Sequence, residues 1–191
     1  MKRRQLGQDG PAVYPVGIGA MSFTNFYGPT SEAASLAILD AALEAGVTVI
    51  DTANVYGAGS SETLIGQYLK ANPAARQAFK ITTKAGITRK PDGTGNFFDN
   101  SAKHLESELD KSLGRLGIEA VDLFYIHRRD QSIPIEEVAH TLAGFVKAGK
   151  VKAIGFSEIA PSSLRRAHAV HPVAAVQSEY SLSARAPELG L

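Results

Sequence analysis

Short apolar runs alternate with amphipathic segments along most of the chain. Six runs have the length and the β-branched content that are typical of parallel strands covered on both faces. These runs lie at residues 16–21, 47–50, 79–83, 121–126, 151–156 and 174–178. Between them apolar residues recur at helical spacing, as at Leu105, Leu109, Leu113 and Leu116. The pattern therefore predicts strands and helices in alternation.

Capping residues indicate where the helices begin and end. Thr30 or Ser31 can accept a backbone N–H at the start of one helix and Ser101 at the start of another. Gly46 and Gly117 stand just past expected helix ends, as C′ glycines do. Pro134 suits the first turn of a further helix. The expected helices are residues 31–45, 62–71, 102–116, 134–148 and 162–169.

Each strand and its helix occupy about 30 residues, and this repeat is typical of a (β/α) barrel. The predicted fold class is therefore α/β. The six units in the sequence are fewer than the eight that such a barrel needs. Residues 4–13, with Asp9-Gly10 at their centre, are expected to form a hairpin before the first unit. We predict one partial barrel domain over residues 1–191.

Composition narrows the function classes. The chain has 191 residues, 44% of them apolar, a formal net charge of +1 and no cysteine. A balanced charge does not favour nucleic acid or an anionic membrane as partner. The lack of cysteine excludes disulfide scaffolds, thiolate metal sites and cysteine nucleophiles. With no long apolar run and a polar start after Met1, a cytoplasmic location is expected and no metal site is predicted.

Polar residues follow three of the predicted strands. Asp51 and Tyr56 come after the strand at 47–50, Lys84 comes after the strand at 79–83, and His127 comes after the strand at 121–126. Parallel α/β folds bind ligands where the carboxyl ends of the strands meet. We therefore expect these four side chains to converge on one opening.

The four residues form a coherent set for carbonyl reduction. Hydride addition leaves negative charge on oxygen, so a proton donor must stand beside it. A tyrosine can be that donor if a lysine cation stabilises its phenolate, and a buried lysine needs a carboxylate as counter-ion. Tyr56, Lys84 and Asp51 fit these roles, and His127 can orient the carbonyl oxygen.

Structural readings of the same residues stay open at this point. Lys84 could extend along apolar surface to reach solvent, and His127 could be a hydrogen-bonded core residue. Arg128 and Arg129 are interpreted as salt-bridged loop residues in preference to substrate anchors. Aromatic residues of the loop after the first strand fit a substrate pocket and a packed surface loop equally well; they are Phe23, Phe26 and Tyr27.

Several motifs in order make the whole chain resemble the aldo-keto reductase family. The matching pieces are Asp51-Thr-Ala-Asn-Val-Tyr56-Gly with Ser61-Glu62, Thr83-Lys84, Leu123-Phe-Tyr-Ile-His127, Gly149-Lys-Val-Lys-Ala-Ile-Gly155 and Gln177-Ser-Glu-Tyr180-Ser181. The resemblance implies a TIM barrel, of which about six units are present here. It also implies NADPH-dependent reduction of aldehydes or ketones.

By this resemblance the catalytic positions and those that contact the cofactor can be assigned. The catalytic set is Asp51, Tyr56, Lys84 and His127. The cofactor-binding set is Met21, Ser157, Gln177 and Tyr180. Many members have Ser-Asn where this chain has Ser157-Glu158. The family also continues into two further units, which carry the contacts to the adenosine phosphates.

Three functions therefore remain. The first is an NADPH-dependent reductase that acts on a small carbonyl substrate. The second is a reductase-like regulatory or binding subunit, and the third is a truncated fragment without activity. Six parallel strands would leave two open edges, which favour self-association. Cofactor binding separates the third function from the others, and turnover of an aldehyde separates the first from the second.

Overall fold

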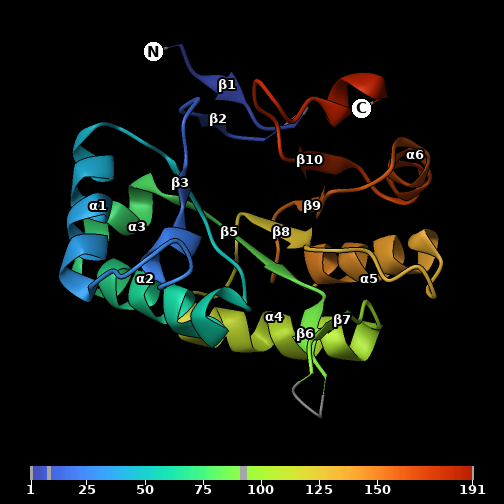
Figure 1. Ribbon diagram of the computed structural model, residues 1–191, viewed down its shortest axis with the longest axis horizontal. Helices are drawn as coiled ribbons and strands as arrows, with labels where there is room; N and C mark the ends of the chain where they lie inside the picture. Colours follow the sequence, from blue (N-terminus) through green and yellow to red (C-terminus); the bar gives the residue numbers. More distant parts are fainter. Residues whose placement is uncertain (1, 8–9, 91–93, 191) are drawn as a thin grey trace.

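A curved sheet of six parallel strands forms the centre of the molecule (Figure 1). The computed structural model describes residues 2–7, 10–90 and 94–190. Along the sheet the strands run in the order β10, β9, β8, β5, β4, β3. Their bounds are β3 (Ile18–Gly19), β4 (Val49–Asp51), β5 (Lys80–Ala85), β8 (Leu123–Ile126), β9 (Ile154–Ser157) and β10 (Val173–Gln177).

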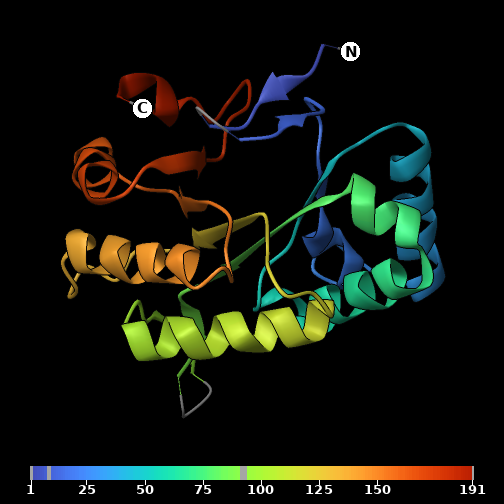
Figure 2. The same cartoon turned by 180° about the vertical axis from the view of Figure 1, so that it is seen from behind.

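Helices lie along the outer face of this sheet (Figures 1 and 2). They are α1 (Glu32–Glu44), α2 (Ser60–Ala71), α3 (Pro73–Ala78), α4 (Ala102–Leu116), α5 (Ile135–Lys147) and α6 (Pro161–Val170). Three short 3₁₀ helices are η1 (Ala20–Phe23), η2 (Tyr56–Gly59) and η3 (Ala186–Leu189). The alternation of strand and helix predicted from the apolar pattern is confirmed.

The predicted caps are confirmed at two helices. Ser31 and Ser101 accept backbone N–H bonds at the starts of α1 and α4, and Gly117 ends α4 with a φ of 65°. Pro134 is the N-cap of α5 and precedes its first turn. The sequence reading missed α3, which follows α2 after the non-helical Asn72 and begins with Pro73 at its first turn.

Two antiparallel hairpins accompany the sheet. β1 (Arg4–Gln5) pairs with β2 (Ala12–Val13), where a hairpin is expected; Asp9 of its predicted turn lies outside the described residues. β6 (Ile87–Arg89) pairs with β7 (Asn96–Phe98), in a segment for which the sequence pattern predicts no strand. The alternation in this segment is too short to predict a strand pair.

The core lies between the sheet and the helices. Ile50, Ile81 and Phe124 are fully buried, and the Phe124 ring packs edge-to-face on Phe145 of α5 with centroids 6.1 Å apart. Successive strand residues point to opposite faces. The inner face, which points away from the helices, therefore carries the alternate residues of each strand. Lys84 of β5 and Tyr125 of β8 are among them.

Within the described residues, β3 and β10 each pair with a strand on one side only. The N-terminal hairpin approaches the β10 side, since a methyl group added at Gly7 would lie 3.1 Å from the Ala174 Cβ atom. The two open edges are those that six parallel units are expected to leave. No helix in the described part of the chain is long and apolar enough to cross a membrane.

Candidate active site

Lys84 is the centre of a buried polar cluster on the inner face of the sheet. Its side chain is fully buried. The Nζ atom donates to Asp51 Oδ2 at 2.6 Å, to the Thr52 carbonyl at 2.9 Å and to the Tyr56 hydroxyl at 3.2 Å. The predicted convergence of Asp51, Lys84 and Tyr56 is confirmed, and the solvent-reaching reading of Lys84 is wrong.

Strand register brings the Asp51 carboxylate to Lys84. β4 pairs with β5 so that Asp51 lies opposite Thr82, and the Thr82 hydroxyl donates to Asp51 Oδ1 at 2.7 Å. Gln177 of β10 donates to Asp51 Oδ2 at 3.1 Å from the far end of the sheet. Although the sequence reading ends the strand at Thr83, β5 continues through Ala85 because its last residues pair with β8.

The loop after β4 carries Tyr56 to the opening of the sheet. The Asn54 backbone N–H donates to the Lys84 carbonyl at 3.1 Å. Beyond Tyr56 the chain turns through Gly57 and Ala58, whose φ angles are 57° and 53°. A left-handed conformation costs energy at alanine, so neighbouring contacts must hold this turn in place.

His127 lies directly after β8 and faces Tyr56. The two rings are edge-to-face with centroids 5.7 Å apart. Burial, followed by the charges of Lys84 and Arg128, lowers the pKa of His127 to about 3. The imidazole is therefore neutral at physiological pH. Its Nδ1 atom is buried without a hydrogen-bond partner among the described residues, so the reading as a satisfied core histidine is wrong.

A second tyrosine lies close to the same carboxylate. Burial, with the charge of Asp51 in addition, raises the pKa of Tyr125 above its ordinary value. The ring of Tyr125 packs over Gly155, where an added methyl would come within 2.5 Å of its Cε1 atom. Tyr125 is thus held in the neutral form beside a carboxylate, whereas the Tyr56 hydroxyl accepts from the Lys84 ammonium and Tyr56 lines the cleft.

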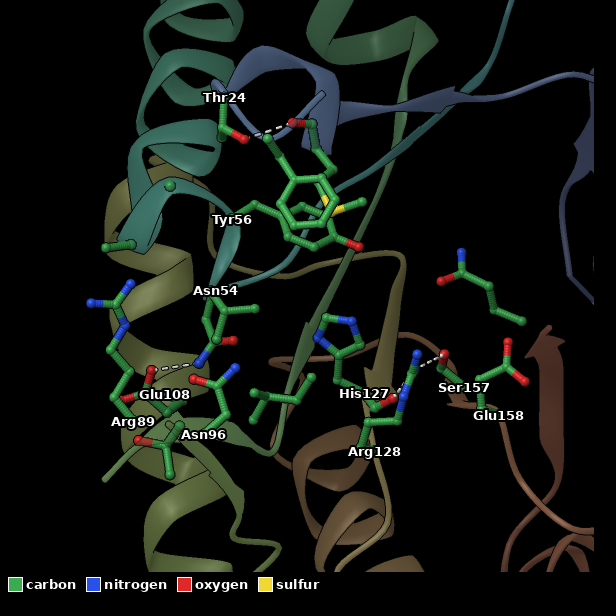
Figure 3. A pocket seen from close by; sticks show the side chains of 18 of the residues that line it. Thr24, Asn54, Tyr56, Arg89, Asn96, Glu108, His127, Arg128, Ser157 and Glu158 are labelled. Carbon is green, nitrogen blue, oxygen red and sulfur yellow. Dashed lines mark hydrogen bonds between the residues drawn. The ribbon is translucent and has the colours of Figure 1, made fainter. Parts of the chain in front are cut away.

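Arg128 projects across the opening towards β9. Its Nη1 atom donates to the His127 carbonyl at 2.7 Å and to the Ser157 hydroxyl at 2.9 Å (Figure 3). Arg129 instead bonds to the Ser163 hydroxyl. Within the described residues neither arginine forms an ion pair. The interpretation of these two as salt-bridged loop residues is therefore wrong.

The expected cofactor-binding residues do not all reach this opening. Met21, Ser157 and Gln177 line it together with Tyr56 and His127, two residues of the expected catalytic set. Tyr180 lies apart and is not part of the lining; it is 64% exposed, and its hydroxyl donates to Glu188. Glu158, next to Ser157, accepts the backbone N–H of Glu179.

The opening is a cleft of about 910 Å³. Figure 3 shows Tyr56, His127 and Asn54 around one space, with Ser157 and Arg128 on its other side. The described residues contain no cluster of three or more His, Asp or Glu side chains that could hold a metal ion. The cleft combines a phenol, which contacts the buried Lys84, with a neutral imidazole and several hydrogen-bond donors.

Comparison with known proteins identifies the family of this chain. Residues 15–191 match the model of the aldo/keto reductase family. The chain belongs to the aldo/keto reductase family. Its curved sheet is accordingly part of the family's TIM barrel, with six parallel strands present.

Two curated aldo/keto reductases illustrate the relationship. The chain is 39% identical over 191 residues to the aldo-keto reductase yakc [NADP(+)] of Schizosaccharomyces pombe, covering 98% of this chain and 55% of that protein. It is 42% identical over 184 residues to the probable aldo-keto reductase 1 of Glycine max, covering 95% and 52%. The chain thus spans about half the length of these relatives.

Solved structures agree with this relationship. Aldo-keto reductase AKR11C1 from Bacillus halodurans, in its holo form, superposes with a TM-score of 0.87 at 29% identity over 99% of this chain and 61% of that chain. Glycerol dehydrogenase AKR11B4 from Gluconobacter oxydans superposes with a TM-score of 0.81 at 29% identity, covering 92% and 54%. The six-stranded part therefore has the family's architecture.

Proposed function

We propose that the chain carries the catalytic half of an oxidoreductase that reduces aldehydes or ketones to alcohols with NADPH. The observation that carries the proposal is the contact of one buried ammonium group, Lys84 Nζ, with both Asp51 and Tyr56. Family membership supports the class of reaction. The coenzyme named for the relative from S. pombe supports NADPH as the cofactor.

In the proposed reaction, NADPH, when bound, supplies the hydride for the carbonyl carbon. Tyr56 donates its hydroxyl proton to the carbonyl oxygen as the C=O bond becomes a C–O bond, so that an alcohol and a phenolate result. The Lys84 ammonium stabilises this phenolate, and Asp51 neutralises Lys84 inside the sheet. His127, neutral because its pKa is about 3, can hydrogen-bond the carbonyl oxygen without adding a charge.

The walls of the cleft fit a nicotinamide. A carboxamide needs both donors and acceptors, and the Ser157 hydroxyl, the Gln177 amide and the Arg128 guanidinium supply these at one side of the cleft. The Arg128 guanidinium reaches this side of the cleft because it donates to the Ser157 hydroxyl. We therefore propose that Ser157, Gln177 and Arg128 hold the carboxamide and that Met21 lies along the ring.

Tyr180 is the weakest of the cofactor assignments. In this structure it is exposed and bonded to Glu188. We keep it as a proposal only for a complex in which the segment after β10 closes over the cleft. A Tyr180→Phe variant with unchanged NADPH affinity would remove it from the site.

Two measurements separate this function from its alternatives. NADPH is titrated into the chain by calorimetry, and the oxidation of NADPH is then followed with a simple aromatic aldehyde. A reductase binds NADPH and turns over the aldehyde. Binding without turnover would favour a regulatory or binding subunit, whereas a folded chain that does not bind NADPH would be a fragment without activity.

A further inference from the structure

The loop that carries Tyr56, residues 52–59, lies against one side of α4. Three polar residues of that helix, Glu108, Lys111 and Arg115, are spaced three and four apart and therefore share a face. All three line the cleft beside the loop. The proposed reaction uses none of them, so their contacts need another explanation.

Glu108 is bonded directly to the loop. The Asn54 amide donates to Glu108 Oε2 at 2.8 Å, as Figure 3 shows, and Asn54 itself is 8% exposed. The backbone N–H of Asn54 meanwhile donates to the Lys84 carbonyl. One residue, two positions before Tyr56, thus connects the end of β5 to α4.

The Glu108 carboxylate is fixed in its ionised form. Its other oxygen, Oε1, accepts from Lys111 at 2.7 Å. Burial by itself would raise the pKa of Glu108, but the hydrogen bonds from Lys111 and Asn54 outweigh burial and leave the pKa below its ordinary value. A charged acceptor makes a stronger hydrogen bond to an amide than a neutral one does.

The far end of the loop is held by the same helix. Arg115 Nε donates at 2.7 Å to Glu62, which is fully buried and also accepts from the Thr83 hydroxyl. Gly59 lies so close to Arg115 that an added methyl would come within 2.8 Å of Cδ. Ala58, with its left-handed backbone, lies in the chain between Asn54, which α4 holds through Glu108, and Gly59, which packs against Arg115. A strained turn keeps its conformation only when surrounding contacts determine it.

We propose that Glu108 is a positioning residue that, by binding Asn54, keeps the Tyr56 loop in register with Lys84. Its consequence for catalysis rests on the proposed function of Tyr56. The placement of the loop does not depend on that function, because it follows from the hydrogen bonds that Asn54 makes to Glu108 and to the Lys84 carbonyl. Removal of the carboxylate should release Asn54 first and let Tyr56 move away from Lys84.

Amide hydrogen exchange of the whole chain, read residue by residue by NMR, tests the proposal. In Glu108→Ala the Asn54 and Tyr56 amides should exchange faster by about tenfold or more, the usual worth of a charge-assisted hydrogen bond. Glu108→Gln should restore much of the protection, because its amide oxygen still accepts from Asn54. Glu106→Ala is the matched control, since Glu106 is an exposed residue of the same helix.

A second variant keeps the test decisive if Glu108→Ala folds poorly. Asn54→Ala removes the other partner and should speed exchange of the Tyr56 amide to a similar extent, and Glu108→Gln added to it should have no further effect. Unchanged exchange at residues 54–56 in both single variants, or an equal change in Glu106→Ala, overturns the proposal.

Turnover separates this inference from the proposed function. If Tyr56 is the proton donor, Glu108→Ala should lower kcat by about tenfold or more, with Glu108→Gln restoring part of it. If Tyr56→Phe leaves turnover unchanged, the proposed function is wrong, while the exchange rates still decide whether Glu108 holds the loop.

Discussion

The middle of the sheet and its β10 edge differ in how much of their side-chain surface is buried. In the middle, Lys84 is fully buried and makes three hydrogen bonds, and Asp51 accepts bonds from three side chains. At the edge, Tyr180, Leu182 and Leu189 are largely exposed. The middle is therefore determined by strand register within this chain, whereas the edge depends on what lies against it.

This difference divides the proposed functions of the cleft between two regions. The proton donor and its charged partners belong to the middle, where a change in one residue should affect chemistry or folding. The proposed carboxamide contacts lie on β9 and β10, where changes should affect cofactor affinity. A substitution in the middle should therefore change turnover or stability, and one on β9 or β10 should change cofactor affinity.

The largest expected effect is the loss of the proton donor. Tyr56→Phe should lower turnover of an aldehyde by about 10² to 10⁴, the usual worth of general acid catalysis, while the Kd for NADPH changes little. Steady-state rates and calorimetric titration measure the two quantities. Tyr27→Phe, a change at an exposed tyrosine, is the control. Equal turnover in the two variants would mean that another group protonates the oxygen.

Removal of the buried ammonium should cost stability as well as activity. Lys84→Met leaves Asp51 without its cation, and loss of one partner of a buried pair typically lowers the free energy of unfolding by about 3 kcal/mol or more. Urea unfolding at neutral pH measures this loss. The double variant Lys84→Met, Asp51→Asn should recover part of it. An unchanged unfolding midpoint in the single variant contradicts the role of Lys84 in the middle of the sheet.

His127 should make stability depend on pH. Its pKa is about 3 in the folded chain and near 6.5 when unfolded, so the unfolded state binds the proton first as pH falls. The part of the free energy of unfolding that depends on a neutral His127 is fully present above about pH 6.5. It declines towards pH 3, by about 2 kcal/mol between pH 7 and pH 5. Urea unfolding at both pH values measures the decline. His127→Asn should remove this part of it; an identical decline in the variant would assign it to other groups.

The smallest expected effect is that of a single substitution at the β10 edge on self-association of the chain. The open strands β3 and β10 favour pairing with a second copy, so the mass of the chain in sedimentation should rise with concentration. Ala175→Lys places a charge on β10 and should shift the chain towards the monomer, whereas Ala169→Lys, at an exposed position of α6, should not. If the chain is a monomer at all concentrations and binds NADPH with a micromolar Kd, the edge needs no partner.

Much of the middle was predictable because local patterns determine it. β-branched runs indicated the strands, serine and glycine caps indicated the ends of α4, and Lys84 was placed near Asp51 and Tyr56 since parallel strands end together. The predicted strand ends were shifted, because pairing with the neighbouring strand, which no local pattern encodes, decides where a strand stops.

Contacts between distant elements could not be predicted. Gln177 reaches Asp51 across 126 positions of the chain, and Glu108 reaches Asn54 across 54. From the sequence, Arg128 is expected to be a salt-bridged loop residue. Its position directly after His127 was the available signal, because the residue that follows a strand-end ligand enters the same loop. The direction of its side chain depends on Ser157, 29 positions later in β9.

The order of the strands also bears on how the chain folds. Each strand of the sheet pairs with the one that precedes it in the sequence, apart from the two hairpins. The four proposed catalytic residues extend from Asp51, the last residue of β4, to His127, directly after β8. We therefore expect that their cluster assembles once β8 has docked, before β9 and β10 join, with the Gln177 bond to Asp51 formed last. Pulse-labelled hydrogen exchange during refolding, with the Ile81 and His127 amides, which bond between β5 and β8, protected earlier than Phe156 and Val176, would establish that sequence of events.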